Sequence, residues 1–283
     1  MPDLTASIVS RLRPSGASRA RVVWLALVLA VAAPAPQALA QAAAQPAASP
    51  ATQPTVDPKT VVLQKKVDTS AAGLPKPARS LSPATSNYGV SIAVAGQSMQ
   101  MTASTEVKRE GNSLIVTDRA KTPMGEATDV ATLDATTLEL QKRSVSQGPM
   151  SLSFEVKDGK ATGEMKMGGD PKPIAVDLGG PLFADGPGAY QVVAALPLAD
   201  GYTTSFRNLD VQSQKGKVVQ LKVAGSESVT VPAGTFDTFK VELSSDDGQT
   251  TTIWVAKDSH KPVKFSSVVP RMNGAVVTSE LQP

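Results

Sequence analysis

Hydrophobic and polar residues alternate along the second half of the chain with a period of two. Phe239, Val241 and Leu243 would share one face of a strand, with Lys240 and Glu242 on the other. The same alternation recurs at 217–226 and at 263–268. Such a pattern is typical of strands with one buried and one wet face, as in a single antiparallel sheet.

Turn signals separate these runs at short intervals, which favours hairpins between neighbouring strands. Asp158-Gly159, Asp247-Gly248 and Asn273-Gly274 each lie between two strand-like runs, and both residue types of such pairs tolerate positive φ. The predicted strands are 88–94, 99–109, 113–119, 126–133, 138–145, 151–156, 160–167, 174–178, 202–209, 217–226, 227–231, 236–243, 249–255, 263–268 and 275–281.

One stretch, 186–196, contains good helix formers and ends before Pro197, which disfavours helix in the preceding residue. About fifteen strands exceed what an open sheet normally holds, so the sheet is expected to curl. The sequence therefore predicts an all-β fold with one short helix, an antiparallel meander rolled into a half-barrel or incompletely closed barrel. The helix would cover its open end.

The first forty residues have the features of an export signal. Four arginines precede an apolar run at 22–33, and Ala38-Leu39-Ala40 matches a small-x-small cleavage site. Twelve apolar residues span about 18 Å as a helix, short of the ~30 Å hydrocarbon core. We expect a signal peptide at 1–40, cleaved near Ala40, and a periplasmic or secreted mature protein.

Residues 41–80 are rich in Ala, Gln and Pro, a composition that predicts a disordered tether. Residues 81–283 then form a single β-rich domain. Without the four Arg and one Asp of 1–40, the chain has 24 basic and 24 acidic residues, so no nucleic-acid or acidic-membrane partner is expected. No transmembrane segment remains after cleavage.

The residue inventory argues against catalysis. There is no Cys, so disulfides, thiol catalysis and lipidation are excluded, and the single His260 lies in a polar stretch that predicts an exposed turn. No G-x-S-x-G elbow presents a serine. Asp246-Asp247 fits a hairpin turn better than a calcium site. We expect no catalytic residue, no metal and no cofactor.

The stretch V-x-V-P-A-G-T-F-D-T-F-K-V (229–241), followed by I-W-V-A-K-D (253–258) and P-V-K-F (262–265), resembles a family of exported bacterial proteins of unknown function. Their pattern is similar to the rolled sheets of lipoprotein carriers. The resemblance implies an antiparallel half-barrel with a helix near its opening and an apolar ligand, and it brings no catalytic residues.

Aromatic residues gather in the second half of the chain. Core packing explains most of them, but a concave apolar surface also suits a ligand. Trp254 is out of phase with Ile253 and Val255, so it either lines a groove or lies on a strand covered on both sides. The candidate ligand-lining residues are Tyr190, Leu196, Phe206, Trp254 and Phe265.

These features favour a non-enzymatic periplasmic protein that binds or carries a lipid-like or other apolar molecule on the concave face of the sheet. The alternative is a structural or interaction protein of the cell envelope that uses a sheet edge or the tether. A hydrolase with residues brought together from distant strands is the third hypothesis. The sequence identifies no protein partner.

Overall fold

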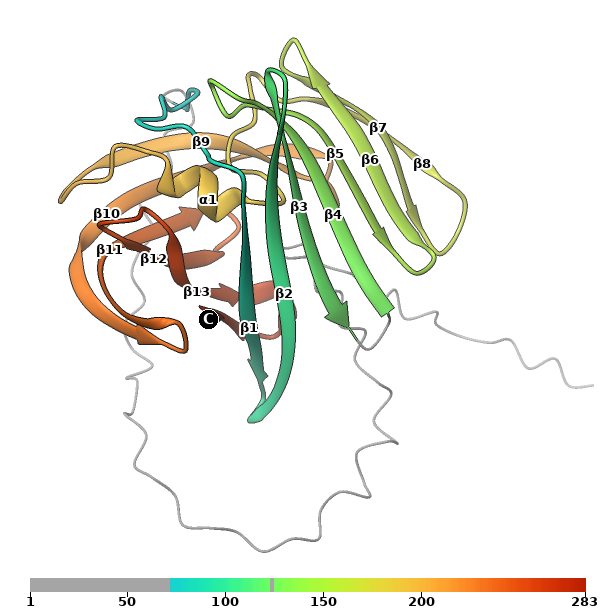
Figure 1. Ribbon diagram of the computed structural model, residues 1–283. Helices are drawn as coiled ribbons and strands as arrows, with labels where there is room; N and C mark the ends of the chain where they lie inside the picture. The colour runs from blue at the N-terminus through green and yellow to red at the C-terminus, as the bar shows by residue number, and fades with distance from the viewer. Residues whose placement is uncertain (1–71, 123–124) are drawn as a thin grey trace, which may run out of the picture.

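The computed structural model describes residues 72–122 and 125–283 (Figure 1). The predicted signal peptide and the tether up to residue 71 lie outside this range. Within it, fourteen strands form one sheet in the order β8-β7-β6-β5-β4-β3-β2-β1-β14-β13-β12-β11-β10-β9, with every neighbouring pair antiparallel. The predicted fold class is confirmed, and the sheet does not close into a barrel.

The elements follow one another with short turns. They are β1 (Ala84–Val94), β2 (Gln97–Glu110), β3 (Ser113–Thr122), β4 (Gly125–Asp134), β5 (Leu140–Gln147), β6 (Met150–Lys157), β7 (Lys160–Met167), β8 (Lys172–Asp177), α1 (Ala189–Ala194), β9 (Thr203–Asp210), β10 (Lys215–Val231), β11 (Gly234–Ser245), β12 (Thr250–Ala256), β13 (Pro262–Val269), the 3₁₀ turn η2 (Pro270–Met272) and β14 (Ala275–Leu281).

Two predicted elements differ from the structure for local reasons. The predicted strands 217–226 and 227–231 are one strand, β10, because a register shift between Val223 and Gly225 absorbs the irregularity without a turn. The predicted helix 186–196 is shorter, because Gly186 and Gly188 have φ of 87° and 67°, outside the helical region. None of the helices in the described ranges is long and apolar enough to span a membrane.

The core lies on the concave side of the curled sheet. Alternate residues of most strands are buried there, for example Val90 and Ile92 on β1 and Leu114 and Val116 on β3. Figure 1 shows α1 on this side, between β9–β13 and β1. The helix buries Val192 and Val193 and contributes to the same core.

Two short segments lie along the free edge of β9 and protect it. Leu182 forms a parallel bridge with Arg207, and Gly73 forms one with Phe206. Further along, the Ala78 N–H donates to the Ala195 carbonyl at 2.9 Å. Residues 72–80, which the sequence assigned to the tether, therefore pack against the domain.

Candidate functional site

A cavity of about 100 Å³ lies between α1 and the inner faces of β9–β13. Its apolar walls include Val193 from α1, Phe206 from β9 and Leu243 from β11. About half of the lining residues are polar or charged, and some of them, such as Arg143 and Asp185, lie among the apolar walls. We call the region where the end of β9 (Asp210) meets the turns after β11 (Asp247) and β13 (Arg271) the mouth of the cavity. Ligand sites are usually concave recesses in which apolar walls are combined with polar groups that fix the orientation of the ligand.

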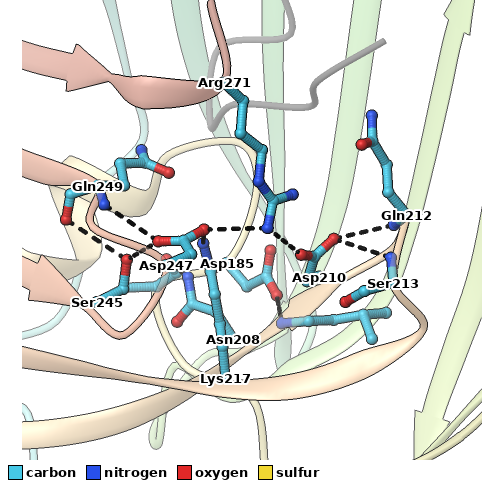
Figure 2. A network of polar contacts seen from close by, with 12 residues as sticks. Asp185, Asn208, Asp210, Gln212, Ser213, Lys217, Ser245, Asp247, Gln249 and Arg271 are labelled. Carbon is cyan, nitrogen blue, oxygen red and sulfur yellow. Dashed lines mark hydrogen bonds and ion pairs between the residues drawn. The ribbon is translucent and has the colours of Figure 1, made fainter. Parts of the chain in front are cut away.

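Arg271 connects the three segments at the mouth. Its Nη2 donates to Oδ2 of Asp210 at 2.8 Å and lies 3.5 Å from Oδ2 of Asp247 (Figure 2). The hydrogen bond to Asp210 is the main cause that raises the pKa of Arg271, and burial opposes it. The two carboxylates lie on either side of the Arg271 guanidinium, so Arg271 connects the end of β9 to the turn after β11 (Figure 2).

Oδ1 of Asp247 is hydrogen-bonded within its own turn, and Oδ2 contacts the two cations Lys217 and Arg271. It accepts from the Ser245 hydroxyl at 2.5 Å and from the Gln249 N–H at 3.2 Å, and Lys217 Nζ lies 3.6 Å away. Burial acts to raise the pKa of Asp247, but the Ser245 hydrogen bond and Lys217 outweigh it and hold the pKa below its usual value. These contacts form a polar turn, as the Asp-Gly sequence indicated. Among the described residues, no group of three His, Asp or Glu side chains could hold a metal ion.

A second polar cluster lies deeper, on the concave face. Arg143 on β5 contacts Asp129 on β4 through Nη2 at 2.7 Å, and Asp185 in the segment before α1 through Nη1 at 3.1 Å. All three side chains are at most 7% exposed. Burial works against the charge on Arg143, but the two aspartates dominate and raise its pKa. Asp185 and Arg143 also line the cavity, which connects this cluster to the mouth.

Asp118 on β3 adds a third buried carboxylate beside this cluster. It pairs directly across the sheet with Asp129, and its Oδ2 accepts from the Gly188 N–H at the start of α1, at 3.3 Å. Its Oδ1 is buried and has no hydrogen-bond partner. Burial, with Asp129 as a smaller contribution, raises the pKa of Asp118 to about 7.

The structure brings three of the candidate ligand-lining residues to one region. Tyr190 and Phe206 line the cavity, and the rings of Tyr190 and Phe265 lie 4.2 Å apart. Burial raises the pKa of Tyr190 to about 12. Leu196 is fully buried after α1 and is not among the residues that line the cavity.

Trp254 lies away from this group, on the outer face of the sheet. Its Nε1 donates to Glu227 Oε1, and Lys264 Nζ lies 5.7 Å from its ring. Its neighbours Ile253 and Val255 are fully buried, so Trp254 points to the opposite side, as its phase indicated. That side is the charged convex surface and not the concave one.

His260 is half-buried and not the exposed turn residue that the sequence predicted. Its Nδ1 lies 3.1 Å from the Ala194 carbonyl at the end of α1, and its ring is 6.2 Å from that of Phe239. Its φ of 51° places its backbone in the left-handed region. Nothing in the local sequence indicates this long-range contact.

The family described as "Protein of unknown function (DUF3108)" matches residues 85–281 of the chain. No curated protein matches the sequence. Among solved structures, a β-barrel-like protein of the domain of unknown function DUF1849 from Brucella abortus is 8% identical with a TM-score of 0.45; the match covers 75% of this chain and 97% of that one.

Two further solved structures are similar at 12% identity and a TM-score of 0.28. One is a DUF1329 family protein from Desulfovibrio piger ATCC 29098, with 70% of this chain and 82% of that chain covered. The other is a candidate exported protein with a YmcC-like fold from Bacteroides fragilis NCTC 9343, with 75% and 98% covered.

Proposed function

We propose that this chain, which belongs to the DUF3108 family, is a non-enzymatic binding protein of the bacterial envelope. It holds the apolar part of a small ligand in the cavity between α1 and β9–β13. The export signal predicted at 1–40 supports a periplasmic location. The observation that carries the proposal is the cavity itself, a recess whose lining combines the apolar side chains of Val193, Phe206 and Leu243 with about as many polar residues as apolar ones.

The size of the cavity limits the ligand. The cavity, at about 100 Å³, is smaller than the ~150 Å³ engineered cavity that admits a benzene molecule. Only a short apolar group, or the end of a longer chain, fits this space. A lipid-like ligand would therefore insert a few carbon atoms and leave the rest at the mouth.

The sheet edges favour ligand binding over the alternative of an envelope interaction protein. Leu182 and Gly73 cover the edge of β9. The other edge, β8, is six residues long and carries Lys172 and Pro173. Short edge strands with Lys and Pro are poor templates for a further strand. Recruitment of a partner strand is therefore disfavoured at both edges.

A titration with straight-chain alcohols tests the proposal without involving a charged head group. We expect butanol and hexanol to shift the NMR signals of Val193 and Phe206. Affinity should rise by about 0.8 kcal/mol per added CH₂ until the cavity is filled. The absence of shifts at these residues throughout the series would overturn the proposed function.

A blocked variant provides the control. Leu243 is a half-buried wall residue, so Leu243→Trp should fill the cavity and abolish alcohol binding. Val268 lies on the outer face and is 42% exposed, so Val268→Trp should bind as the wild type does. If both variants bound the alcohols equally well, the alcohols would have to bind outside this cavity.

A further inference from the structure

We infer that the head group of the ligand is an anion, a carboxylate or phosphate, bound by Arg271 and Lys217 at the mouth of the cavity. This inference rests on the proposed function, because it concerns the same cavity. It follows from which hydrogen-bonding groups at the mouth are already occupied and which are not.

The carboxylates at the mouth have their partners within the protein. Asp210 accepts from the N–H groups of Gln212 and Ser213 at 3.0 and 3.2 Å, in addition to Arg271. Asp247 has the four partners described above. These acceptors would gain little from a donor on a ligand, because they would exchange one charged donor for another.

The two cations, in contrast, have donors to spare. The contacts of Arg271 among the described residues involve Nη2, which leaves Nε and Nη1 of a group with five N–H donors. Its side chain is 40% exposed, so a ligand can reach it. Lys217 Nζ has only the long 3.6 Å contact with Asp247 and lines the cavity. The charged groups with unused hydrogen-bonding capacity are therefore cations, and among the described residues the remaining unpartnered buried lining atom is the neutral amide oxygen Oδ1 of Asn208.

Charge leads to the same ligand class. Asp247 Oδ2 already lies between the two cations, 3.5 Å from Arg271 Nη2 and 3.6 Å from Lys217 Nζ, so a carboxylate or phosphate would bind beside it. There it would accept charge-assisted hydrogen bonds from the unused Nε and Nη1 of Arg271 and from the spare N–H groups of Lys217. A cationic head group would have to displace Arg271 from Asp210 and Asp247. With the apolar wall below, the expected ligand is an amphiphile with an anionic head and a short apolar segment.

Hexanoate, hexylamine and hexanol have six carbon atoms each and differ in the charge of the head group. Comparing their affinities therefore separates the contribution of the head group to binding from that of the apolar chain in the cavity. We expect hexanoate to bind roughly 10-fold or more tightly than hexanol, and hexylamine no better than hexanol. Hexyl phosphate tests the second anionic head. Acetate and inorganic phosphate test the head alone and should bind far more weakly than the chain-bearing anions.

The variant Arg271→Gln should lose most of the preference for hexanoate over hexanol, measured as the ratio of the two affinities in the same variant. Retained hexanol binding shows that the variant is folded. Arg119→Gln, which removes an exposed arginine that pairs with Glu106, is the matched control and should bind hexanoate normally. Hexanol binding without any preference for hexanoate would overturn this inference and leave the proposed function intact.

Discussion

Arg143 is the residue on which the buried polar cluster depends. It is 4% exposed and is the cation that Asp129 and Asp185 contact directly inside the sheet. Arg143→Ala would leave their charges buried without compensation. We expect a loss of about 3–5 kcal/mol in the free energy of unfolding, measured by urea denaturation. Arg119→Ala removes an exposed ion pair and should cost about 1 kcal/mol or less. Similar losses for the two variants would contradict the assigned role.

Asp118 gives the stability a dependence on pH. The pKa of this carboxyl is about 7 in the folded protein, whereas an aspartate without interactions, as in the unfolded chain, has a pKa of 3.8. Between about pH 4 and 7 the unfolded chain releases this proton while the folded chain retains it. The contribution of Asp118 to stability is therefore complete below pH 4 and is lost as the pH rises through 7.

Asp118→Asn removes this titration and provides the measurement. The groups that face Asp118 are Asp129, Arg143, Tyr88 and Tyr190, and they remain in the variant. Urea unfolding from pH 5 to 8 should show the variant gaining stability relative to the wild type as the pH rises. The exposed Asp170→Asn should show a constant difference. A constant difference for Asp118→Asn as well would refute the assignment.

The buried cluster was not predicted from the sequence, although part of its signal was present. Asp118 is in phase with Leu114 and Val116, and Asp129 is in phase with Ala131, so alternation places both carboxylates on the apolar face. Asp185, which pairs with Arg143, is 42 residues away from it in the sequence. Periodicity assigns a residue to a face, but it does not reveal which distant side chain meets it there.

The position of α1 depends on a close contact at its first turn. Gly188 has φ of 67°, and a Cβ at this position would lie 2.5 Å from Val116 Cγ1. Gly188→Ala should therefore displace the helix and cost about 1–3 kcal/mol in the free energy of unfolding.

Gly201 separates crowding from backbone strain. Its φ is 77°, but no atom lies within 4 Å of the position of its Cβ. Gly201→Ala should carry only the penalty for positive φ and should cost less than Gly188→Ala in the same thermal or urea unfolding experiment. Equal losses would show that the contact with Val116 does not hold the helix in place.

At the scale of elements, the positions of the strands and turns could be predicted from the sequence, but the side of the curled sheet that each strand face would occupy could not. The hairpin signals at Asp158-Gly159 and Asn273-Gly274 both lie at observed turns, because a two-residue turn is determined locally. Trp254 shows where this prediction ends. The sequence correctly places Trp254 on the face opposite Ile253 and Val255, but whether that face is concave or convex depends on the curl of the whole sheet.

At the scale of the whole molecule, segments that are not strands cover the free edge of the curled sheet. Residues 72–80 cross the edge at β9, where the Ala72 carbonyl accepts from Arg207, and reach the end of α1 at Ala195. Ala72 is 5% exposed and Pro75 is buried. Their composition resembles that of the preceding residues, so the sequence could not separate this packed segment from a tether.

Truncation tests whether this segment belongs to the folded unit. A chain that begins at Leu81 loses the burial of Ala72 and Pro75, the bridge at Gly73 and the hydrogen bond to Ala195. We expect it to be about 1–3 kcal/mol less stable in urea than a chain that begins at Ala72.

The uncovered edge of β9 should also make the shorter chain associate more readily, which sedimentation would detect. Equal stability and a monomeric state for both chains would show that 72–80 only rests on the domain. A loss of stability without association would assign the segment to packing alone and leave the protection of the edge to Leu182.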